Sequence, residues 1–357
     1  MTRLQTYGYQ ETASTPAGLE PGRVTELRRE QYTVMTEHGE MTAKLKGKFY
    51  YDNSQRDSFP CVGDFVLLEL ADGTARIAEL LPRHSKFSRA DFSGHAAGYV
   101  KTVLEQVVAA NFDFVFIVSS LNKDFNLKRI LRYLTQARQS GGAPVVVLTK
   151  ADLAVNAEAM AAEVLAIAPD VPVHCVSSKT GAGLHSLAPY LLPGKTAVFL
   201  GMSGVGKSSL LNALMGETVM EVKTIREDDS RGRHTTTHRA LFQLPSGAMV
   251  IDTPGMRELG LFEADDGINV GFDDVEALFA DCRFHNCRHQ GEPGCAVTAA
   301  LQAGTLTQER WDSYRDQQRE VRFMNSKAAY LANKRAWGKS IAKWSKEQQK
   351  EEGEPID

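Results

Sequence analysis

A glycine-rich segment near the middle of the chain has the residue types and the spacing that bind phosphate. The run Gly201-Met202-Ser203-Gly204-Val205-Gly206-Lys207-Ser208 matches the P-loop pattern G-x-x-x-x-G-K-[ST] and follows an apolar strand at 196–200. Backbone N–H groups of such a loop close around phosphate oxygens, and the dipole of the helix that follows at 208–215 favours negative charge. Lys207 would contact the β- and γ-phosphates, and the hydroxyl of Ser208 would bind Mg²⁺. We therefore predict that residues 201–209, Ser209 included, bind a nucleoside triphosphate.

Two segments after the P-loop could contact the same metal ion and the γ-phosphate. Asp252 ends a hydrophobic strand and opens Asp-Thr-Pro-Gly, so its carboxylate would lie near Mg²⁺ and the N–H of Gly255 near the γ-phosphate. Before it, a polar stretch contains Gly-Arg-His234-Thr235-Thr236-Thr. A threonine hydroxyl there could complete the Mg²⁺ shell only when γ-phosphate is present, which predicts a switch segment. The spacing does not choose between Thr235 and Thr236, and a plain turn and a simple threonine-rich loop are the alternatives.

The residue that orients the attacking water does not stand at its usual place in the pattern. Many GTPases place a glutamine directly after the D-x-x-G element, but this chain has Met256, which cannot hold water usefully. His234, beside the switch threonines, is the best candidate to position water, with Lys207 as the cation on the transferred phosphoryl group. His238 is a weaker rival, and a surface loop histidine is the alternative. We expect slow intrinsic turnover.

Two strand ends that precede the P-loop could recognise guanine. Thr149-Lys150-Ala151-Asp152 follows the strand 145–148, and Ser177-Ser178-Lys179 follows the strand 171–176. The carboxylate of Asp152 can accept from guanine N1–H and N2–H₂ together, whereas adenine lacks both donors and would leave the acid unpaired. Lys150 would lay its stem along the ring, and backbone N–H groups at 177–179 could cap guanine O6. Each element alone is a common strand end, so the prediction depends on their combination.

Three cysteines and a histidine near the C-terminus have the spacing of a metal site. Cys282, Cys287, His289 and Cys295 form the Cys₃His set of a closed tetrahedral zinc site. A filled shell leaves no position for catalysis, so we predict one structural Zn²⁺. The alternatives are a redox or buried thiol cluster, and His285 in place of His289.

The rest of the sequence indicates three kinds of structure. Alternating runs between residues 22 and 89, separated by Gly and Asp turns, predict a small antiparallel barrel of OB type. After residue 100, continuous apolar strands alternate with helices at 127–139 and 157–168, which predicts a parallel sheet covered on both faces. Beyond residue 273 the pattern becomes helical.

Composition limits the possible partners. The 357 residues carry a net charge of −3, which excludes nucleic-acid binding through overall charge. Residues 326–350, however, contain seven basic side chains, one acidic side chain and interleaved Tyr330, Trp337 and Trp344. This tail fits a helix on rRNA, although a solvated basic helix and an acidic protein partner are alternatives. No apolar run reaches the roughly 18 residues that span a bilayer, and no secretory signal is evident, so we expect a cytoplasmic protein without membrane contact.

The order of the motifs is unusual. Guanine recognition precedes the P-loop, the switch and the magnesium carboxylate, which a circularly permuted sheet would explain without changing the site. The fold class expected is therefore multidomain: an N-terminal OB-type β-barrel, a central α/β P-loop GTPase domain with circularly permuted motif order, and a C-terminal mainly helical zinc-binding domain. The boundaries expected are 1–22 for a flexible leader, 23–100, 101–273 and 274–357.

These motifs, from residue 22 to about 350, resemble the ribosome small-subunit-dependent GTPase A family, called RsgA or YjeQ. The resemblance is carried by residues 77–89, the P-loop, Gly-Arg-His-Thr-Thr-Thr at 232–237, Asp-Thr-Pro-Gly at 252–255 and the Cys/His cluster. It implies a GTPase that acts in late assembly of the small ribosomal subunit, and it favours His234 for water and His289 for zinc. The family usually has asparagine where this chain has Thr149, whose hydroxyl reaches less far toward guanine N7 and the P-loop backbone. We therefore expect weaker nucleotide affinity but retained guanine selection.

The function expected is that of a GTPase that binds the small (30S) ribosomal subunit and its rRNA and assists late maturation of the subunit. We expect it to act as a monomer and to hydrolyse GTP to GDP and phosphate, with stimulation by the ribosome. A second hypothesis is a guanine-nucleotide-sensing RNA- or ribosome-binding regulator with little turnover. A third is a P-loop ATPase with a zinc-finger RNA domain, against which Asp152 and Ser177 argue.

Overall fold

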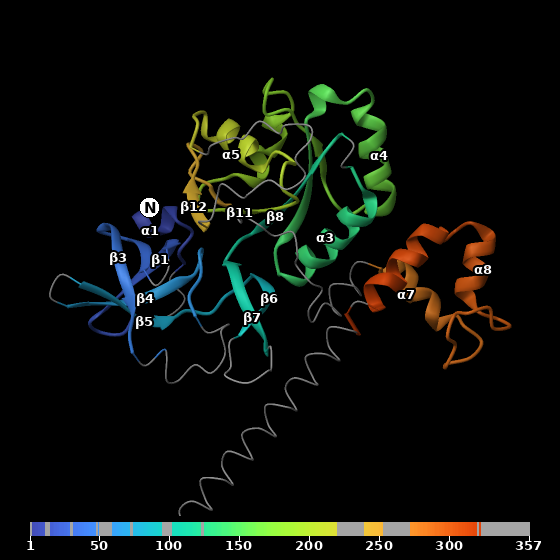
Figure 1. Ribbon diagram of the computed structural model, residues 1–357, viewed down its shortest axis with the longest axis horizontal. Coiled ribbons are helices and arrows are strands. Elements are labelled where there is room, and N and C mark those ends of the chain that lie inside the picture. The colour runs from blue at the N-terminus through green and yellow to red at the C-terminus, as the bar shows by residue number, and fades with distance from the viewer. Residues whose placement is uncertain are drawn as a thin grey trace, which may run out of the picture.

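Three structural units lie side by side in the computed structural model. The structure describes residues 2–10, 15–28, 31–47, 49, 59–71, 74–94, 102–122, 125–219, 239–252, 272–319 and 321–322. An α/β domain stands between an N-terminal barrel and a C-terminal helical unit (Figure 1). In the part of the chain that is described, no helix has the length and apolar composition needed to cross a bilayer.

The N-terminal unit is a closed five-stranded barrel. Its strands run in the order β1-β2-β3-β5-β4, and β4 pairs back to β1. The strands are β1 (Leu19–Arg28), β2 (Gln31–Thr36), β3 (Gly39–Leu45), β4 (Phe65–Ala71) and β5 (Thr74–Leu80). Alternate residues such as Val24, Val34 and Ile77 are fully buried inside it. The barrel predicted from the alternating runs is therefore present, although β1 and β2 contain consecutive buried residues where a strict alternation would expose every second one.

The α/β domain contains a parallel sheet with one antiparallel edge strand. From one edge the order is β10-β9-β8-β11-β13-β12, with only β12 antiparallel to its neighbour. Its elements are β8 (Phe114–Ser120), α3 (Leu127–Gln139), β9 (Ala143–Thr149), α4 (Ala157–Ile167), β10 (Val173–Cys175), β11 (Thr196–Leu200), α5 (Lys207–Met215), β12 (Arg239–Gln243) and β13 (Met249–Asp252). Short 3₁₀ turns lie at Ala151–Leu153 and Leu184–Tyr190.

Both faces of this sheet are covered, as the uninterrupted apolar strands predict. In β8, Val115 and Ile117 pack with residues of α3 and α4, whereas Phe116 and Val118 pack on the other face with Leu210 of α5. This doubly covered sheet places the carboxyl ends of β8, β9, β11 and β13 at one edge, where ligands bind in such folds.

The barrel and the α/β domain share one continuous sheet, which the sequence did not indicate. Glu26 and Leu27 of β1 pair with Ala240 and Arg239 of β12, so that eleven strands of the described chain are joined. A separate hairpin pairs β6 (Lys86–Gly94) with β7 (Thr102–Ala110). The boundary expected between residues 100 and 101 falls between these two paired strands.

The expected flexible leader at 1–22 needs correction, because its described residues include a short helix and the start of a barrel strand. The hydroxyl of Thr2 caps the short helix α1 (Arg3–Thr6), and the carboxylate of Glu37 accepts hydrogen bonds from the backbone of Arg3 and Leu4 at 3.0 Å. Leu4 is 1% exposed. Residues 19–22 belong to the barrel strand β1. Residues that looked like a polar leader therefore complete the barrel.

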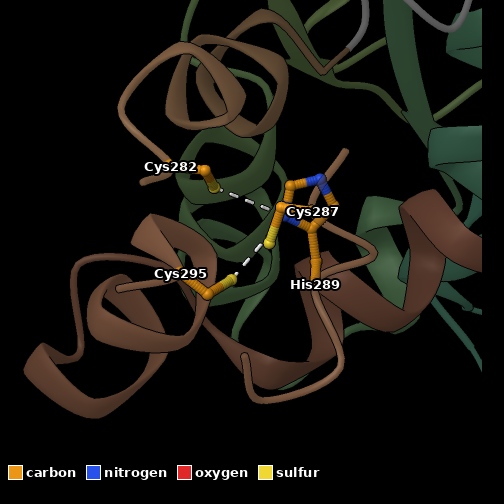
Figure 2. Close-up of side chains that lie close together, drawn as sticks. All are labelled: Cys282, Cys287, His289 and Cys295. Atoms are coloured by element: carbon orange, nitrogen blue, oxygen red, sulfur yellow. Dashed lines mark hydrogen bonds between the residues drawn. The ribbon is translucent and has the colours of Figure 1, made fainter. Parts of the chain in front are cut away.

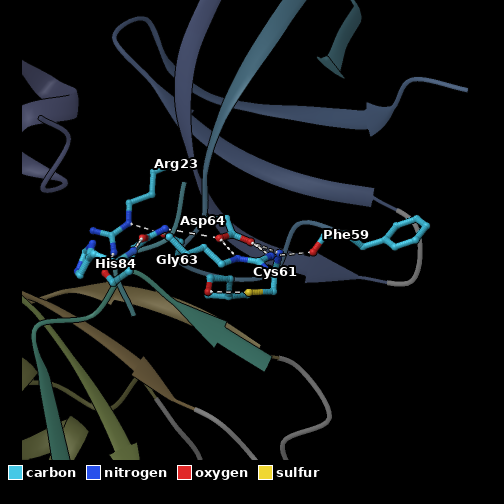
Figure 3. Close-up of polar contacts among 9 residues, drawn as sticks. Arg23, Phe59, Cys61, Gly63, Asp64 and His84 are labelled. Atoms are coloured by element: carbon cyan, nitrogen blue, oxygen red, sulfur yellow. Dashed lines mark hydrogen bonds and ion pairs between the residues drawn. The ribbon is translucent and has the colours of Figure 1, made fainter. Parts of the chain in front are cut away.

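A buried arginine connects the barrel with the α/β domain (Figure 3). The guanidinium of Arg23, 1% exposed, donates to the carbonyl oxygens of Tyr7 at 2.5 Å, Asn111 at 2.7 Å and Gly63 at 3.2 Å. It also lies 3.2 Å from the sulfur of Met249 in β13. Burial lowers the pKa of Arg23 to about 10, so the side chain keeps its charge at neutral pH. Four segments distant in sequence thus meet at one cation.

Replacing Arg23 by methionine should destabilise the protein by about 3 kcal/mol, because the carbonyl groups of Tyr7 and Asn111 lose this donor and that of Gly63 keeps only the side-chain amide of Asn111 at 3.3 Å. Urea unfolding would measure the difference. Arg28→Met on the same strand is the control, since that side chain is 64% exposed and pairs with the nearby Glu26; its cost should stay below about 1 kcal/mol. Equal midpoints for the two variants would show that the junction does not depend on Arg23.

The C-terminal unit consists of α7 (Asp273–Ala280), the cysteine-containing loop, α8 (Ala296–Ala303) and helical residues 308–319. Within this unit the guanidinium of Arg310 binds both carboxylate oxygens of Asp274 in α7, at 2.6 and 2.8 Å. The same guanidinium links the unit to the α/β domain, because it donates to the carbonyl of Ile167 in α4 at 3.2 Å. The buried hydroxyl of Thr135 in α3 lies 2.6 Å from the side-chain oxygen of Gln317. The basic tail predicted at 326–350 lies outside the described residues.

Candidate functional site

The P-loop lies at the carboxyl end of β11, the strand between β8 and β13. Gly206 precedes α5 with φ at 101°, a left-handed conformation that glycine adopts without steric cost. A side chain at Gly201 would place its Cβ 2.3 Å from the carbonyl oxygen of Val118, so the loop needs glycine there as well. The loop therefore passes close to β8 and presents the N-terminus of α5 beside it, which is the geometry that holds phosphate.

The predicted phosphate and magnesium side chains surround this loop. The ammonium of Lys207 lies 2.7 Å from the carbonyl of Gly201 and 2.6 Å from that of Met202. Ser208 and Ser209 are half-buried in the first turn of α5. Asp252 ends the neighbouring strand β13, is 4% exposed and pairs in register with Phe199 of β11. Gly255, His234, Thr235 and Thr236 lie outside the described residues.

The motif predicted to recognise guanine contacts the P-loop directly. The hydroxyl of Thr149 donates to the carbonyl of Val205 at 2.5 Å, and the ammonium of Lys150 donates to that of Gly204 at 2.9 Å. These residues are more than fifty positions apart in sequence. The short side chain of Thr149 therefore reaches the P-loop backbone, because β9 ends close to the loop; the weaker nucleotide affinity expected from threonine at this position stays a prediction.

Asp152 and Ser177 are brought together from neighbouring strand ends. The hydroxyl of Ser177 donates to the carboxylate of Asp152 at 2.6 Å; Ser177 is fully buried, whereas Asp152 is exposed. The backbone N–H of Ser177 donates to Ala182, so Ser178 and Lys179 are the better donors for a guanine oxygen. A buried hydroxyl thus holds an accessible carboxylate at the carboxyl ends of neighbouring strands.

The four predicted metal ligands converge on one point in the C-terminal unit (Figure 2). Their donor atoms all lie within 4.8 Å of one another. The Nδ1 atom of His289 is 3.6 Å from the sulfur of Cys282 and 3.7 Å from that of Cys295. A tetrahedral zinc with ordinary bond lengths has sulfur–nitrogen edges of about 3.6 Å. The donor set of Cys282, Cys287, His289 and Cys295 therefore fits one zinc ion.

Groups around the cluster shift the pKa values of its thiols in opposite directions. The backbone of His289 lowers the pKa of Cys287, but desolvation and contacts with Cys295 and Cys282 raise it to about 11. Cys295 caps α8, and burial opposes its ionisation, but hydrogen bonds from Thr298 and His289 bring the pKa of its thiol to about 6. The backbone N–H of Ala296 lies 3.4 Å from the sulfur of Cys282. The ring of His289 stacks on Phe279 with centroids 4.2 Å apart, which fixes its orientation. Such outer contacts orient ligands in metal sites.

With both sites described, the comparisons with known proteins agree with the geometry. The model of the RsgA GTPase family matches residues 80–262. A relative from Lactiplantibacillus plantarum named small ribosomal subunit biogenesis GTPase RsgA 2 is 45% identical over 311 residues, which cover 87% of this chain and 86% of the relative. The chain belongs to the RsgA GTPase family. It is therefore a GTPase, and the family implies Mg²⁺ with GTP.

Other RsgA relatives and solved structures support the same assignment. A protein from Opitutus terrae named small ribosomal subunit biogenesis GTPase RsgA is 44% identical and covers 84% of this chain and 83% of its own length. The structure of YjeQ from Thermotoga maritima superposes with a TM-score of 0.61 at 27% identity, over 84% of this chain and 96% of that one. YloQ, described as a circularly permuted GTPase, shares the fold with a TM-score of 0.58 at 24% identity, over 87% and 98%. The predicted fold class is confirmed.

Sequence reasoning missed two contacts in this RsgA nucleotide site. The first is the hydroxyl of Ser177 on Asp152; its position at the end of the strand next to β9 was the available signal. The second is the use of the Val205 carbonyl as the partner of Thr149. Neither the distance between two strand ends nor the direction of a loop carbonyl can be read from residue types.

Proposed function

We propose that this RsgA GTPase binds the small ribosomal subunit, assists its late maturation, and hydrolyses GTP to GDP and phosphate faster when the subunit is bound. The observation that carries the proposal is the contact of Thr149 and Lys150 with the P-loop, because it joins base and phosphate recognition in one pocket. The printed names of the relatives, which match most of the chain, supply the ribosomal partner. A subunit partner implies action in the cytoplasm, and we expect a monomer.

The residue roles in this proposal follow the positions around the loop. Lys207 and the backbone at 201–209 bind the phosphates, Asp152 with the backbone at 178–179 binds the base, and Lys150 covers its ring. Ser208, Asp252 and one of the switch threonines hold Mg²⁺, with Gly255 at the γ-phosphate. When bound, Mg²⁺ neutralises charge on the β- and γ-phosphate oxygens. The Cys₃His cluster holds one structural Zn²⁺.

Catalysis in this scheme depends on positioning rather than on a covalent step. Lys207 stabilises negative charge on the transferred phosphoryl group. His234 orients the attacking water, a task that Met256 in the usual glutamine position cannot perform. Because His234 stands beside the switch threonines, the subunit would accelerate turnover by holding the switch segment in the catalytic arrangement.

His234→Ala should lower kcat by about 100-fold while leaving GDP affinity unchanged, because a positioned proton acceptor contributes roughly that much. Phosphate release under saturating GTP and subunits measures turnover, and calorimetry measures affinity. His238→Ala is the control and should keep most of the activity. Full turnover in His234→Ala would remove that residue from the mechanism without affecting the nucleotide site.

Phosphate release with and without purified small subunits tests the proposed function. An accelerating partner of a GTPase can raise turnover by about a thousandfold or more, and we expect a stimulation of that kind. Equal rates would contradict it. Nucleotide binding with negligible turnover, even with saturating subunits, would favour the second hypothesis of a guanine-nucleotide-sensing regulator.

A further inference from the structure

Thr149 occupies a closed position between the end of β8 and the P-loop. Its side chain is 1% exposed, and its hydroxyl oxygen lies 2.5 Å from the carbonyl oxygen of Val205 and 3.3 Å from that of Ser119. A Cβ added at Gly206 would come within 3.4 Å of the same hydroxyl. The threonine is therefore packed directly against the loop that cradles phosphate.

The chemistry of a hydroxyl limits what this residue can do for a nucleotide. A threonine hydroxyl has one proton to donate, and both polar neighbours of Thr149 are carbonyl acceptors. The shorter contact assigns that proton to Val205. Guanine N7 is also an acceptor, so it could be recognised at this position only by a donor. The proton that could have served N7 is already used inside the protein.

The neighbouring side chain at this end of β9 is held in the same way. The ammonium of Lys150 donates to the carbonyl of Gly204 at 2.9 Å, on the same loop. The carboxylate of Asp152 instead accepts a hydrogen bond from the hydroxyl of Ser177 at 2.6 Å and is exposed. A carboxylate accepts from N1–H and N2–H₂, which lie on the opposite edge of guanine from N7.

We infer that Thr149 is a positioning residue that ties β9 to the P-loop, and that the site selects guanine through the N1/N2 edge without reading N7. The inference rests on the proposed guanine site. It extends the ligand class to guanosine phosphates altered at purine position 7, including those in which carbon replaces N7. Such nucleotides should bind as well as the natural ones.

Calorimetry on the full-length, zinc-loaded protein with GDP and 7-deaza-GDP tests this directly. We expect dissociation constants within twofold of each other, whereas 7-deaza-GDP binding tenfold or more weakly would overturn the inference. Inosine diphosphate, which lacks the 2-amino group, should bind at least tenfold more weakly than GDP. If no guanine nucleotide binds, the proposed guanine site fails and the inference falls with it; if inosine diphosphate binds like GDP, the 2-amino group is not read by Asp152 and selection through the N1/N2 edge is overturned.

Variants of Thr149 separate positioning from direct recognition. Thr149→Val keeps the side-chain volume but removes the bond to Val205, so GDP and 7-deaza-GDP should weaken by the same factor, about fivefold, the worth of one hydrogen bond. A loss confined to GDP would show that the hydroxyl reads N7 and would overturn the inference. Thr149→Ser keeps the hydroxyl and should bind both nucleotides like the unmodified protein, which preserves the test if the valine variant does not fold. Unequal binding by the serine variant would also count against the inference.

Discussion

Asp152→Asn should exchange guanine for xanthine as the preferred base. The carboxylate accepts two hydrogen bonds from guanine, whereas an amide has one acceptor and one donor, and the donor would face the 2-amino group. Loss of one charge-assisted bond, loss of the charge from the other and the new donor–donor contact together predict that GDP affinity falls on the order of 100-fold. Xanthine carries an oxygen where guanine has the amino group, so xanthosine diphosphate should bind the variant more tightly than GDP.

Competition calorimetry with the two diphosphates measures this exchange. Asp170→Asn is a matched control, because that carboxylate is 65% exposed, pairs with Arg138 and stands before β10 rather than at its carboxyl end. It should leave both affinities unchanged. The Asp152→Asn variant could instead bind GDP within threefold of the unmodified protein and bind xanthosine diphosphate no more tightly than GDP. That result would show that this carboxylate does not select the base.

Cys295→Ala should release the zinc and unfold the C-terminal unit alone. The buried apolar cluster of this unit is small, and a structural zinc contributes on the order of 10 kcal/mol to the folding of such a region. We expect bound zinc to fall from one per chain to near zero, and residues 272–322 to lose hydrogen-exchange protection. The α/β domain should keep its protection, because its core lies in two separate clusters.

Three further variants sharpen the zinc experiment. Cys175→Ala removes a half-buried thiol from β10 and should retain zinc. His289→Ala should lose it, whereas His285→Ala should not, because His285 is exposed and lies outside the cluster that converges on one point. Adding a chelator to the unmodified protein provides an independent measurement that needs no variant. Full zinc content and unchanged protection in Cys295→Ala would contradict the assignment.

Local patterns predicted the parts of the structure that depend on local chemistry. The apolar run at 143–149 is β9, because a strand buried on both faces is apolar at nearly every position. The periodic segment at 127–139 is α3, because a helix buried on one face repeats its apolar residues every three to four positions. The metal ligands could be recognised because thiolates and imidazole at short spacing have few other uses. The permuted order was visible because each motif marks its own strand end.

Features that depend on distant partners could not be predicted in this way. The sequence of β1 contains Pro21 and Gly22, which normally indicate a loop. In the barrel, Pro21 pairs with Leu67 of β4, and a Cβ at Gly22 would come within 2.5 Å of Val34, so close strand packing requires the glycine. Arginine is almost never fully buried, so the position of Arg23 could not be inferred from its residue type. Tertiary contacts overrode the local preferences at these positions.

The central claim is that strand ends from both sides of the P-loop form one pocket that selects guanosine phosphates. Calorimetric titration of the zinc-loaded protein with GDP and with ADP, each with Mg²⁺, tests it most directly. We predict saturable binding of one GDP per chain and ADP binding at least 100-fold weaker, since adenine would leave Asp152 unpaired. Equal affinities for the two nucleotides, or no binding of GDP, would contradict the claim.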